Sequence, residues 1–353
     1  MKNKTLIYIN ARFLTQQLTG VQRFAIEIAK RIRYSQDFDI CFVSPKGILD
    51  AALSQELNVI TFGCFSSHLW EQIELPLYLL KKGNPILLSL CNTAPVLYNK
   101  NVVVIHDLAF IENPKWFSYA FSKYYRLIIP VIIRKSMHVI TVSNFSKNEI
   151  IRTYKVNSKK ISIIYNGIEH IRETHDGSIN DLKQSYFLMV GSLDPRKNIQ
   201  YVIDAFSSKE LQKFQLKIVG GSSKIFSQKI KHKSDNIEFL GRVSDTILAD
   251  LYKKAKGFIY ISLYEGFGIP PIESLCFDTL PIVSDIEVFR EVLGDNVIYV
   301  NPHQTSDLID KVTKLSLSDF DYKKKVSLSK KHISKYSWNA SNTQILSLLK
   351  NLT

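Results

Sequence analysis

The feature that most constrains the fold is a series of short apolar segments in which polar and apolar residues do not alternate. Strands of a parallel sheet covered on both faces are apolar throughout, whereas strands with one wet face alternate. Helical periodicity follows two of these segments, in VQRFAIEIAKRI and NFSKNEIIRTY. The segments of the first half lie at 5–10, 39–44, 86–90, 102–108, 137–143 and 161–168. This half therefore predicts one doubly wound α/β domain.

The same pattern then restarts. The polar stretch 170–185 has no clear period and is interpreted as a linker. After it, apolar segments lie at 186–192, 215–221, 237–243, 257–262, 280–285 and 297–301, with helices predicted near 199–207 and 245–255. The stretch 305–353 is predicted to be helical. We expect a first Rossmann-like domain over 1–172, a second over 173–335, and a helix over 336–353 that packs back toward the first domain.

The stretch YEGFGIPPIES places Glu265 and Glu273 on either side of two glycines and a Pro-Pro pair. It follows a predicted strand, and Pro270 or Pro271 suits the first position of a helix because its missing N–H costs nothing there. Glu273 is then expected in the first turn of that helix, with Glu265 in the loop before it. Ligands of open α/β sheets bind beyond the carboxyl ends of the strands. Both carboxylates are therefore expected at one crevice.

Ionised carboxylates only accept hydrogen bonds, so they suit the vicinal hydroxyls of sugars and not an anion. Two of them could serve two polyols, such as a hexose and a ribose. The alternative is that Glu273 merely interacts with a helix dipole and that Glu265 is a surface residue. The joint pattern with Gly-Phe-Gly and Pro-Pro favours the sugar site.

Two cations follow the first strand of the second half, in VGSLDPRKN. Arg196 offers a bidentate fork and Lys197 a point charge, directly before a predicted helix whose N-terminus also attracts anions. This combination predicts a phosphate site. A solvated basic turn is the alternative.

Two weaker signals lie in the first half. His106 and Asp107 follow the predicted strand 102–108, where a histidine can bind a sugar hydroxyl or serve only the structure. The loop ending at Gly20 precedes a helix and could offer backbone N–H groups to a phosphate. It lacks the G-x-G-x-x-G pattern of dinucleotide-binding dehydrogenases.

The positive charge is concentrated in the first half. The chain carries +14 overall, of which residues 1–172 contribute +11 and the remainder +3. Such a field attracts phosphates of nucleic acid, anionic lipid or a phosphorylated substrate. A generically basic surface is the alternative.

Other bulk features narrow the class. The longest uncharged apolar run of the first half, Leu127–Ile133, is far shorter than the ~20 residues of a membrane helix, and the N-terminus shows no signal-peptide pattern. The four cysteines form no Cys-x-x-Cys pair, which argues against a zinc site and for a reducing cytosol.

Taken together, the motifs resemble glycosyltransferase family 4, the retaining enzymes of the GT-B fold. The resemblance spans nearly the whole chain and rests on TGVQRF, VIHDLAF, VITVSNFSKNEI, IIYNGI, VGSLDPRKN, FLGRVSD, YEGFGIPPIES and YSWNAS. It implies two Rossmann-like domains facing an interdomain cleft.

The resemblance also implies roles. Glu265 would bind the hydroxyls of the donor sugar near the reacting carbon, and Glu273 the ribose of the nucleotide. Arg196 and Lys197 would stabilise the diphosphate as the sugar leaves. In the first half, Gly20 would contact the diphosphate, and His106 would contact the sugar and the reaction centre. Near the base would lie Gly220, Gly221 and the 240–243 loop with Val243. Further donor contacts would come from Gly266, Phe267 and Gly268 within the motif. No metal or other cofactor is expected.

Two departures from the family pattern stand out. Asp278 occupies a position where glycine is expected, but aspartate tolerates the left-handed backbone conformation. A second small residue beside Gly20 is missing, which leaves the phosphate role of that loop open.

The resemblance predicts transfer of a hexose from a nucleotide-diphosphate sugar, with GDP-mannose as first choice, to a saccharide acceptor. A lipid-linked acceptor of O-antigen or capsule synthesis is favoured, because the segment 116–135 interleaves aromatic and basic residues and suits an anionic membrane surface. An ordinary packed helix is the alternative for that segment. A cytoplasmic enzyme is expected, peripheral on the membrane if the surface interpretation holds.

Rival hypotheses remain. The donor could be dTDP-rhamnose or a UDP-sugar, or the enzyme could epimerise a nucleotide sugar without an acceptor. A non-catalytic nucleic-acid-binding protein is suggested only by the pI of 9.4. It leaves the glutamate pair unexplained, and no nucleic-acid partner is expected.

Overall fold

The computed structural model describes residues 4–172, 184, 186–192, 194–221, 234–317 and 319–353. Of the expected linker, residues 173–183 and 185 therefore lie outside the described residues, as does residue 193 of VGSLDPRKN. The chain forms two compact units. One consists of Met1–Gly167 with Ser337–Thr353, and the other of Ile168–Tyr336.

The first unit contains a seven-stranded sheet in the order β3-β2-β1-β4-β5-β6-β7. All neighbouring strands are parallel, as the unbroken apolar segments predict. The strands are β1 (Thr5–Asn10), β2 (Phe38–Ser44), β3 (Ile60–Thr61), β4 (Ile86–Ser89), β5 (Asn101–Val104), β6 (His138–Thr141) and β7 (Ile161–Ile163). The short edge strand β3 was not predicted, because two residues carry no periodicity.

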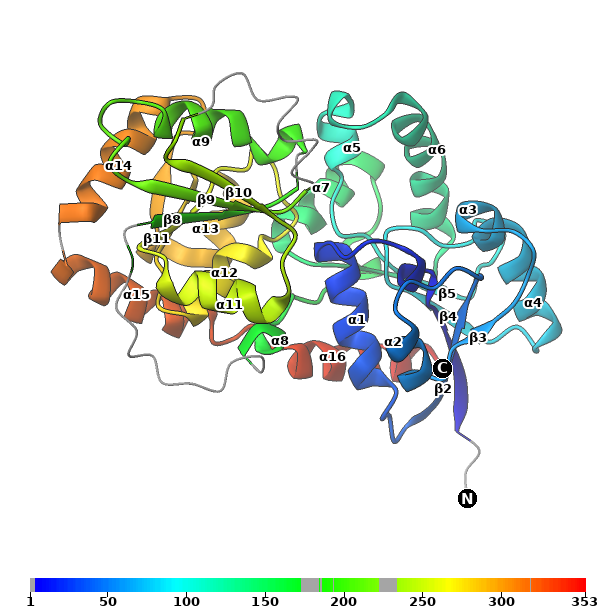
Figure 1. Cartoon of the computed structure of the whole chain (residues 1–353). Coiled ribbons are helices and arrows are strands. Elements are labelled where there is room, and N and C mark those ends of the chain that lie inside the picture. Colours follow the sequence, from blue (N-terminus) through cyan, green and yellow to red (C-terminus); the bar gives the residue numbers. More distant parts are fainter. Residues whose placement is uncertain (1–3, 173–183, 185, 193, 222–233, 318) are drawn as a thin grey trace. The chain divides into compact units, whose positions relative to one another are not determined.

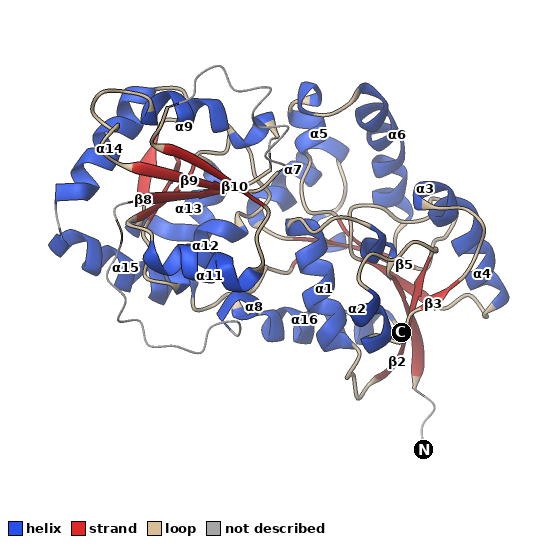
Figure 2. Ribbon diagram, viewed as in Figure 1, coloured by secondary structure: helices blue, strands red, loops and turns tan. Residues whose placement is uncertain are grey.

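Helices lie on both sides of this sheet (Figure 2). They are α1 (Gly20–Ile32), α2 (Ala51–Glu56), α3 (Ser67–Leu69), α4 (Leu75–Lys81), α5 (Ala109–Glu112), α6 (Tyr119–Lys135), α7 (Asn144–Tyr154) and α16 (Trp338–Leu352), with the π-helical turn η2 (Trp70–Glu74) between α3 and α4. The helices predicted from periodicity, α1 and α7, appear within one residue of their expected bounds.

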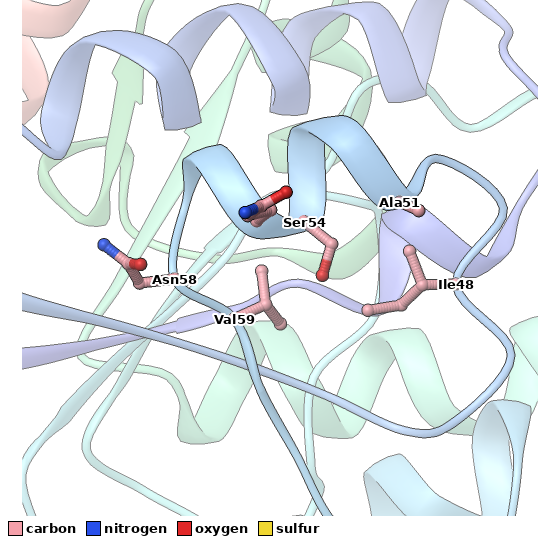
Figure 3. Close-up of a pocket in the computed structure, with 6 residues that line it drawn as sticks. Ile48, Ala51, Ser54, Asn58 and Val59 are labelled. Carbon is pink, nitrogen blue, oxygen red and sulfur yellow. The ribbon is translucent and has the colours of Figure 1, made fainter.

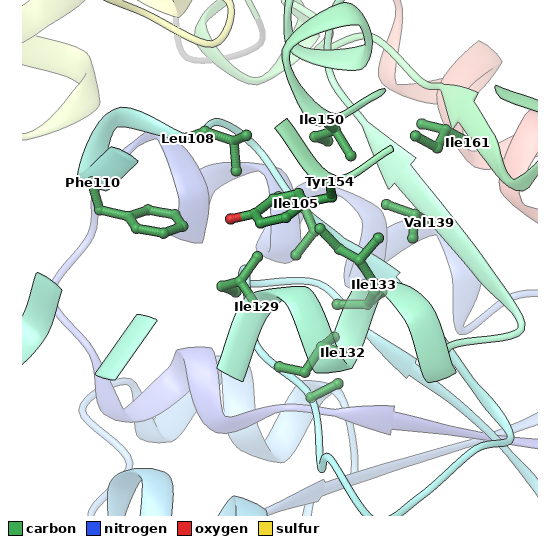
Figure 4. Packing of buried hydrophobic residues seen from close by; sticks show 12 residues of the cluster. Ile105, Leu108, Phe110, Ile129, Ile132, Ile133, Val139, Ile150, Tyr154 and Ile161 are labelled. Carbon is green, nitrogen blue, oxygen red and sulfur yellow. The ribbon is translucent and has the colours of Figure 1, made fainter. Parts of the chain in front are cut away.

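A buried aliphatic cluster joins the sheet to α6 and α7 (Figure 4). Val103 and Val139 come from β5 and β6, Ile129 and Ile133 from α6, and Ile150 from α7, all fully buried. β-Branched residues suit both the strands and the close packing of such an interior. The cluster holds the carboxyl ends of β5 and β6 in place.

The last helix, α16, belongs to the first unit although it ends the chain. Its Trp338 is fully buried and meets Phe24 of α1 edge to face, with ring centroids 5.8 Å apart. Ser341 Oγ donates to the carbonyl of Tyr165 at 2.6 Å. Figure 1 shows α16 lying beside α1.

The second unit contains a six-stranded sheet in the order β10-β9-β8-β11-β12-β13, again parallel throughout. Its strands are β8 (Tyr186–Val190), β9 (Gln215–Val219), β10 (Ile237–Gly241), β11 (Gly257–Tyr260), β12 (Pro281–Ser284) and β13 (Ile298–Val300). Its helices are α8 (Glu169–Arg172), α9 (Ile199–Phe206), α11 (Asp245–Lys254), α12 (Ile269–Cys276), α13 (Glu287–Leu293), α14 (Thr305–Leu317) and α15 (Asp319–Ile333).

The prediction for Asp278 is confirmed. This residue follows α12 with φ 56°, in the left-handed region where glycine would be usual. Its carboxylate pairs with Lys330 of α15 at 2.8 Å, and its carbonyl accepts from Tyr322 at 2.8 Å. Lys330 and Tyr322 of α15 therefore stabilise a turn after α12 in which glycine would be the usual residue.

Candidate functional site

The strand order of the second sheet reverses between β8 and β11. The chain moves outward from β8 through β9 to β10, and then returns to the other side of β8 with β11. Loops that leave the carboxyl ends of two such strands diverge, and ligands of doubly wound folds bind at this point. The two motifs singled out in the sequence, around Lys197 and around Glu265, are the loops that follow these two strands.

Local hydrogen bonds fix the first loop. Asp194 caps the short 3-10 helix η5 (Pro195–Lys197) by accepting from the Arg196 N–H at 3.0 Å. Asn198 follows with φ 53° and donates to the carbonyl of Pro302 at 2.9 Å. The Leu263 N–H donates to the carbonyl of Arg196 at 2.8 Å, which ties this loop to the one after β11.

Lys197 and Glu265 form a buried ion pair across the two loops. Tyr260, the last residue of β11, donates its hydroxyl to Glu265 Oε1 at 3.0 Å, and Lys197 Nζ lies 2.5 Å from the same hydroxyl. Arg196 Nη1 lies 3.9 Å from Glu265 Oε2. The structure thus brings together three of the predicted site residues, with Tyr260 as a fourth member that the sequence analysis missed.

The charges in this group are strongly coupled. Burial opposes ionisation of Glu265, but the ammonium of Lys197 and the guanidinium of Arg196 outweigh it, so the pKa of Glu265 is lowered. Burial, with the negative Glu265 beside it, raises the pKa of Tyr260 well above its ordinary value. Glu265 is therefore a carboxylate and Tyr260 a neutral donor at pH 7.

Glu273 has a different set of partners. His170 of α8 donates from Nε2 to Glu273 Oε1 at 2.8 Å, and the Tyr252 hydroxyl of α11 donates to Oε2 at 3.0 Å. Neither residue was predicted as part of the site, since His170 is 103 positions from Glu273 and no local pattern connects them. The carboxylate and both donors are buried.

The predicted helical position of Glu273 is wrong. Helix α12 begins at Ile269, so Pro270 and Pro271 are its second and third residues and Glu273 is its fifth. The helix starts earlier because Gly268, with φ 95°, makes the turn that precedes it. Glu273 therefore lies beyond the first turn, and its environment comes from His170 and Tyr252.

The Gly-Phe-Gly segment is buried and tightly packed. A Cβ on Gly268 would lie 2.6 Å from Phe289 Cε1, so both its backbone angle and its neighbour require glycine. Phe267 meets Tyr336 edge to face at 5.2 Å. Gly266 is buried between Glu265 and Phe267.

Gly220 has a structural reason of its own. It has φ 122°, and a Cβ there would lie 2.0 Å from the carbonyl oxygen of Gly191, which follows β8. Its N–H donates to the carbonyl of Gly241 at 2.7 Å. Gly221 also has positive φ, and Val243 is half-buried in the loop after β10. These glycines let three neighbouring loops pack closely at the carboxyl edge of the sheet.

His106 and Gly20 belong to the first unit. The buried His106 ring donates from Nε2 to the carbonyl of Leu90 at 2.9 Å, and burial lowers its pKa, so it is neutral. Its ring meets Phe24 edge to face at 5.1 Å. Gly20 is the first residue of α1, and the preceding Thr19 makes no side-chain cap.

A buried ion pair in the first unit was also missed. Arg12 follows β1 and contacts Glu71 of η2, with Nε 3.2 Å from Oε1. Thr93 accepts from Arg12 Nη2 at 2.8 Å, and Asn10 Nδ2 donates to Glu71 Oε1 at 2.7 Å. These groups lie where the order of the first sheet reverses between β1 and β4. The signal in the sequence was an arginine two positions after the end of an apolar strand.

A small pocket of the first unit lies at α2 (Figure 3). It is lined by Ile48, Ala51, Ser54, Gln55, Asn58 and Val59, none of which is charged or was predicted as a site residue. Within the described ranges, no three His, Cys, Asp or Glu side chains are grouped to hold a metal ion. In the same ranges, no helix has the length and apolar character needed to cross a bilayer.

Solved structures resemble this chain along nearly its whole length. A glycosyltransferase from Rickettsia africae superimposes with a TM-score of 0.74 at 19% identity, covering 99% of both chains. Anabaena Alr3699/HepE, solved in complex with UDP and glucose, gives 0.73 at 16% identity and covers 99% of this chain and 100% of its own. They show the GT-B glycosyltransferase fold, which confirms the predicted fold class.

Sequence comparisons agree. The family profile described as Glycosyltransferase Family 4 matches residues 18–172, and that described as Glycosyl transferases group 1 matches residues 171–335. The O-antigen chain mannosyltransferase RfbU of Salmonella typhimurium is 31% identical over 320 residues, covering 83% of this chain and 86% of that protein. O-antigen chain mannosyltransferase B of Escherichia coli is 24% identical over 70% of each chain. The chain belongs to glycosyltransferase family 4, the retaining hexosyltransferases.

Proposed function

We propose that this enzyme transfers mannose from GDP-mannose to a saccharide acceptor during assembly of a bacterial surface polysaccharide. The observation that carries the donor site is the buried Glu265 carboxylate held by Lys197, Tyr260 and Arg196 at the reversal point of the sheet. The choice of mannose is supported by the two O-antigen mannosyltransferases among the relatives.

The geometry supports specific roles at the donor. Glu265 would accept hydrogen bonds from hydroxyls of the sugar. An ammonium has three donors. Glu265 and Tyr260 occupy two of those on Lys197, so the third can reach a phosphate oxygen. Arg196 would add a bidentate contact to the diphosphate. Both cations would stabilise the charge that develops when the bond from the anomeric carbon to the phosphate oxygen breaks.

Retention follows if the acceptor attacks on the face that the diphosphate leaves. The acceptor oxygen bonds to the anomeric carbon, and its proton passes to the departing phosphate oxygen. No nucleophile of the enzyme is then needed, and catalysis rests on positioning and charge stabilisation. His106 of the first unit would contribute a neutral ring to the sugar, and the backbone N–H groups at the start of α1, from Gly20 on, would contact the diphosphate.

Other donors are the main rivals. The Anabaena neighbour was solved with UDP and glucose, so a UDP-sugar is a direct alternative to GDP-mannose, and dTDP-rhamnose is another. A GT-B epimerase would convert the donor without an acceptor. Product analysis with donor alone separates that possibility from transfer.

The deciding experiment is a thermal-shift panel with GDP, UDP, dTDP and ADP and their sugars, with and without EDTA. We expect stabilisation by GDP and GDP-mannose that EDTA does not change. Stabilisation by UDP or dTDP alone would indicate a UDP-sugar or a dTDP-sugar as the donor in place of GDP-mannose. No shift with any nucleotide, in a folded sample, would contradict the proposed donor site.

We further propose that the first unit docks on an anionic membrane that carries a lipid-linked acceptor. Helix α6 exposes Tyr119, Leu127 and Val131 beside the exposed Lys123 and Arg126. Residues 113–148 contain six Lys or Arg and no acidic residue. An exposed apolar surface flanked by basic residues suits the interface of an anionic bilayer.

A second apolar stripe supports the same surface. Leu69, Ile73, Leu77 and Leu80 follow one face of α3, η2 and α4, and each is between 44% and 60% exposed. His68 of α3 contacts Tyr124 and Tyr125 of α6, with ring centroids 4.7 and 5.9 Å apart, so the two helical segments are neighbours (Figure 1).

Vesicle co-sedimentation tests this surface. Binding should require phosphatidylglycerol in the vesicles and should fall in Leu77→Ser/Leu80→Ser and in Lys123→Glu/Arg126→Glu. The matched control, Lys323→Glu/Lys324→Glu, reverses two exposed charges on α15 of the other unit and should bind normally. Binding that ignores lipid charge, or is equal in all variants, would contradict membrane docking.

A further inference from the structure

We propose that Tyr260 is a positioning residue for sugar transfer, whose one hydroxyl holds Lys197 in place for the diphosphate and Glu265 in place for the sugar. This inference rests on the proposed function, which gives the two charged residues those ligands. It assigns to the end of strand β11 a part in the reaction that neither of the two sequence motifs nor the comparisons describe.

One hydroxyl contacts both charged groups. Tyr260 Oη lies 2.5 Å from Lys197 Nζ and 3.0 Å from Glu265 Oε1. Lys197 Nζ also contacts the same Glu265 oxygen, so the three polar atoms form a closed triangle. Relative exposure is 2% for Tyr260, 9% for Lys197 and 7% for Glu265, so the triangle is shielded from bulk water. Removing the hydroxyl therefore removes a contact from each of the two charged groups.

The direction of these hydrogen bonds follows from the charges. An ammonium only donates and a carboxylate only accepts. Lys197 therefore donates to the Tyr260 oxygen, and the Tyr260 proton goes to Glu265. Burial and the negative Glu265 raise the pKa of Tyr260 well above its ordinary value, which keeps this proton on the hydroxyl. A phenol that accepts from a cation and donates to an anion is polarised in one direction, so each hydrogen bond strengthens the other.

Tyr260 is a more rigid anchor than the side chains that it holds. It is the last residue of β11, in register with Val283 of the neighbouring strand β12. Its ring packs against Phe258 and Phe289, with centroids 5.9 Å away in each case. Lys197, by contrast, carries its ammonium on a flexible four-carbon stem. The sheet thus fixes the hydroxyl, and the hydroxyl fixes the charged groups of two loops.

This anchoring matters because the two charges have different tasks. In the transition state the ammonium must meet the charge that develops on the diphosphate, while the carboxylate stays on the sugar hydroxyls. Groups ordered before the donor arrives lose less conformational entropy during the reaction. A displacement of about 1 Å can cost about 100-fold in rate. Tyr260 would therefore contribute to catalysis without touching the reacting atoms.

The test measures how the protein discriminates between a nucleoside diphosphate and a monophosphate. Calorimetry gives the affinities of GMP and GDP, or of UMP and UDP if the thermal-shift panel favours uridine. The gain from monophosphate to diphosphate reports on Lys197. The variants are Tyr260→Phe, Lys197→Ala and the double variant. Tyr186→Phe is the matched control, because it removes another buried hydroxyl of the same sheet, which donates to the carbonyl of Leu251 at 2.8 Å.

Tyr260→Phe should reduce the preference for the diphosphate about fivefold to tenfold, as expected for a weakened hydrogen bond to a charged group. Affinity for the monophosphate should stay within about twofold, because the ring and its packing remain. In turnover, kcat should fall about 10–100-fold and KM for the donor should rise less, since charge on the diphosphate is greatest in the transition state. Tyr186→Phe should match the natural protein.

The double variant shows whether Tyr260 acts through Lys197. In the Lys197→Ala background, Tyr260→Phe should have no further effect on the preference for the diphosphate, because effects that share one partner are not additive. An equal effect in both backgrounds would overturn the positioning role. So would a natural preference and near-normal kcat in folded Tyr260→Phe.

The remaining outcomes separate this inference from the function on which it rests. Equal weakening of monophosphate and diphosphate binding in Tyr260→Phe, or equal losses in Tyr186→Phe, would show general destabilisation and would overturn the inference while leaving the donor site intact. If the natural protein binds no nucleoside diphosphate, the proposed function fails and this inference with it.

Discussion

Two buried ion pairs of this protein join residues from distant segments of the chain. Lys197 and Glu265 are 68 positions apart, and Arg12 and Glu71 are 59 apart. A buried charge whose partner is removed costs far more than the pair contributes when intact. Single substitutions should therefore change activity at the Lys197–Glu265 pair and stability at the Arg12–Glu71 pair.

At the Lys197–Glu265 pair, Lys197→Ala or Glu265→Ala should lower kcat about 100-fold or more, the usual loss when one stabilising group at a developing charge is removed. Steady-state assays with the donor found by thermal shift would measure this, with circular dichroism showing that the variants fold. Lys217→Ala is the control, because it removes a lysine of the same unit that pairs with Glu238 and lies over the Tyr186 ring. Near-normal turnover in either variant would contradict the roles assigned to Lys197 and Glu265.

At the Arg12–Glu71 pair, the prediction concerns acid stability. Burial disfavours the Glu71 carboxylate, but Arg12 and His68 outweigh it and lower its pKa from 4.5 to about 2. A depressed carboxylate pKa stabilises the fold above pH 4.5, and this contribution is lost progressively as pH falls toward 2. Between pH 7 and pH 3 the loss should be about 2 kcal/mol.

Urea unfolding at both pH values would measure this loss for the natural protein and for Glu71→Gln, which lacks the titrating group. The variant should be less stable at pH 7, and the difference should shrink by about 2 kcal/mol at pH 3. A difference that is the same at both pH values would show that Glu71 is not held ionised by Arg12.

At the scale of elements, the site depends on loops that pack closely at the carboxyl ends of parallel strands. A glycine lies at the carboxyl end of each of three strands: Gly191 follows β8, Gly220 follows β9, and Gly241 is the last residue of β10. The Gly220 N–H donates to the carbonyl of Gly241 and so joins the loops after β9 and β10. The loop after β8 carries Lys197 and the loop after β11 carries Glu265. Any side chain that separates the neighbouring loops should therefore disturb the cation site as well.

Gly220→Ala should destabilise the second unit by at least about 2 kcal/mol, because φ is 122° and the new Cβ would lie 2.0 Å from the Gly191 oxygen. Gly241→Ala is the matched control. It has φ 69° with open space around it, so it should cost only about 1–2 kcal/mol for the left-handed backbone. Thermal unfolding would compare the stability of the two variants. Equal losses of stability would contradict the close approach of Gly220 to the Gly191 carbonyl oxygen.

At the scale of the whole molecule, the chain returns to its first unit after completing the second. Helix α16 contributes Trp338, Ile345 and Leu349 to the interior of the first unit, all fully buried. The first unit is therefore complete only when the last 17 residues, Ser337–Thr353, are in place.

Trp338→Ala should therefore destabilise the first unit by about 3–5 kcal/mol, although Trp338 lies far along the chain from its partner Phe24. Hydrogen exchange followed by mass spectrometry should show protection lost in α1 and α16 and kept in β8 and β11. Trp116→Ala, at a half-buried tryptophan of the same unit, should change much less. Loss of protection in β8 and β11 would contradict this division of stability.

The sequence by itself determined the fold class and the main recognition motif. Unbroken apolar strands alternating with amphipathic helices leave a covered parallel sheet as the consistent solution, and the pattern occurs twice. The residue types of YEGFGIPPIES and VGSLDPRKN, each after a strand, were enough to place Glu265 and Lys197 at one edge of a sheet. These inferences succeed because periodicity and turn chemistry act within a few residues.

Only the tertiary structure decided which groups hold those side chains. Tyr260 beside Glu265, His170 and Tyr252 on Glu273, Arg12 on Glu71, and Trp338 against Phe24 are contacts between segments that no local pattern links. Strand order and the return of the last helix bring these segments together. The orientation and protonation of a buried polar group depend on such neighbours, because burial makes each missing or added partner costly.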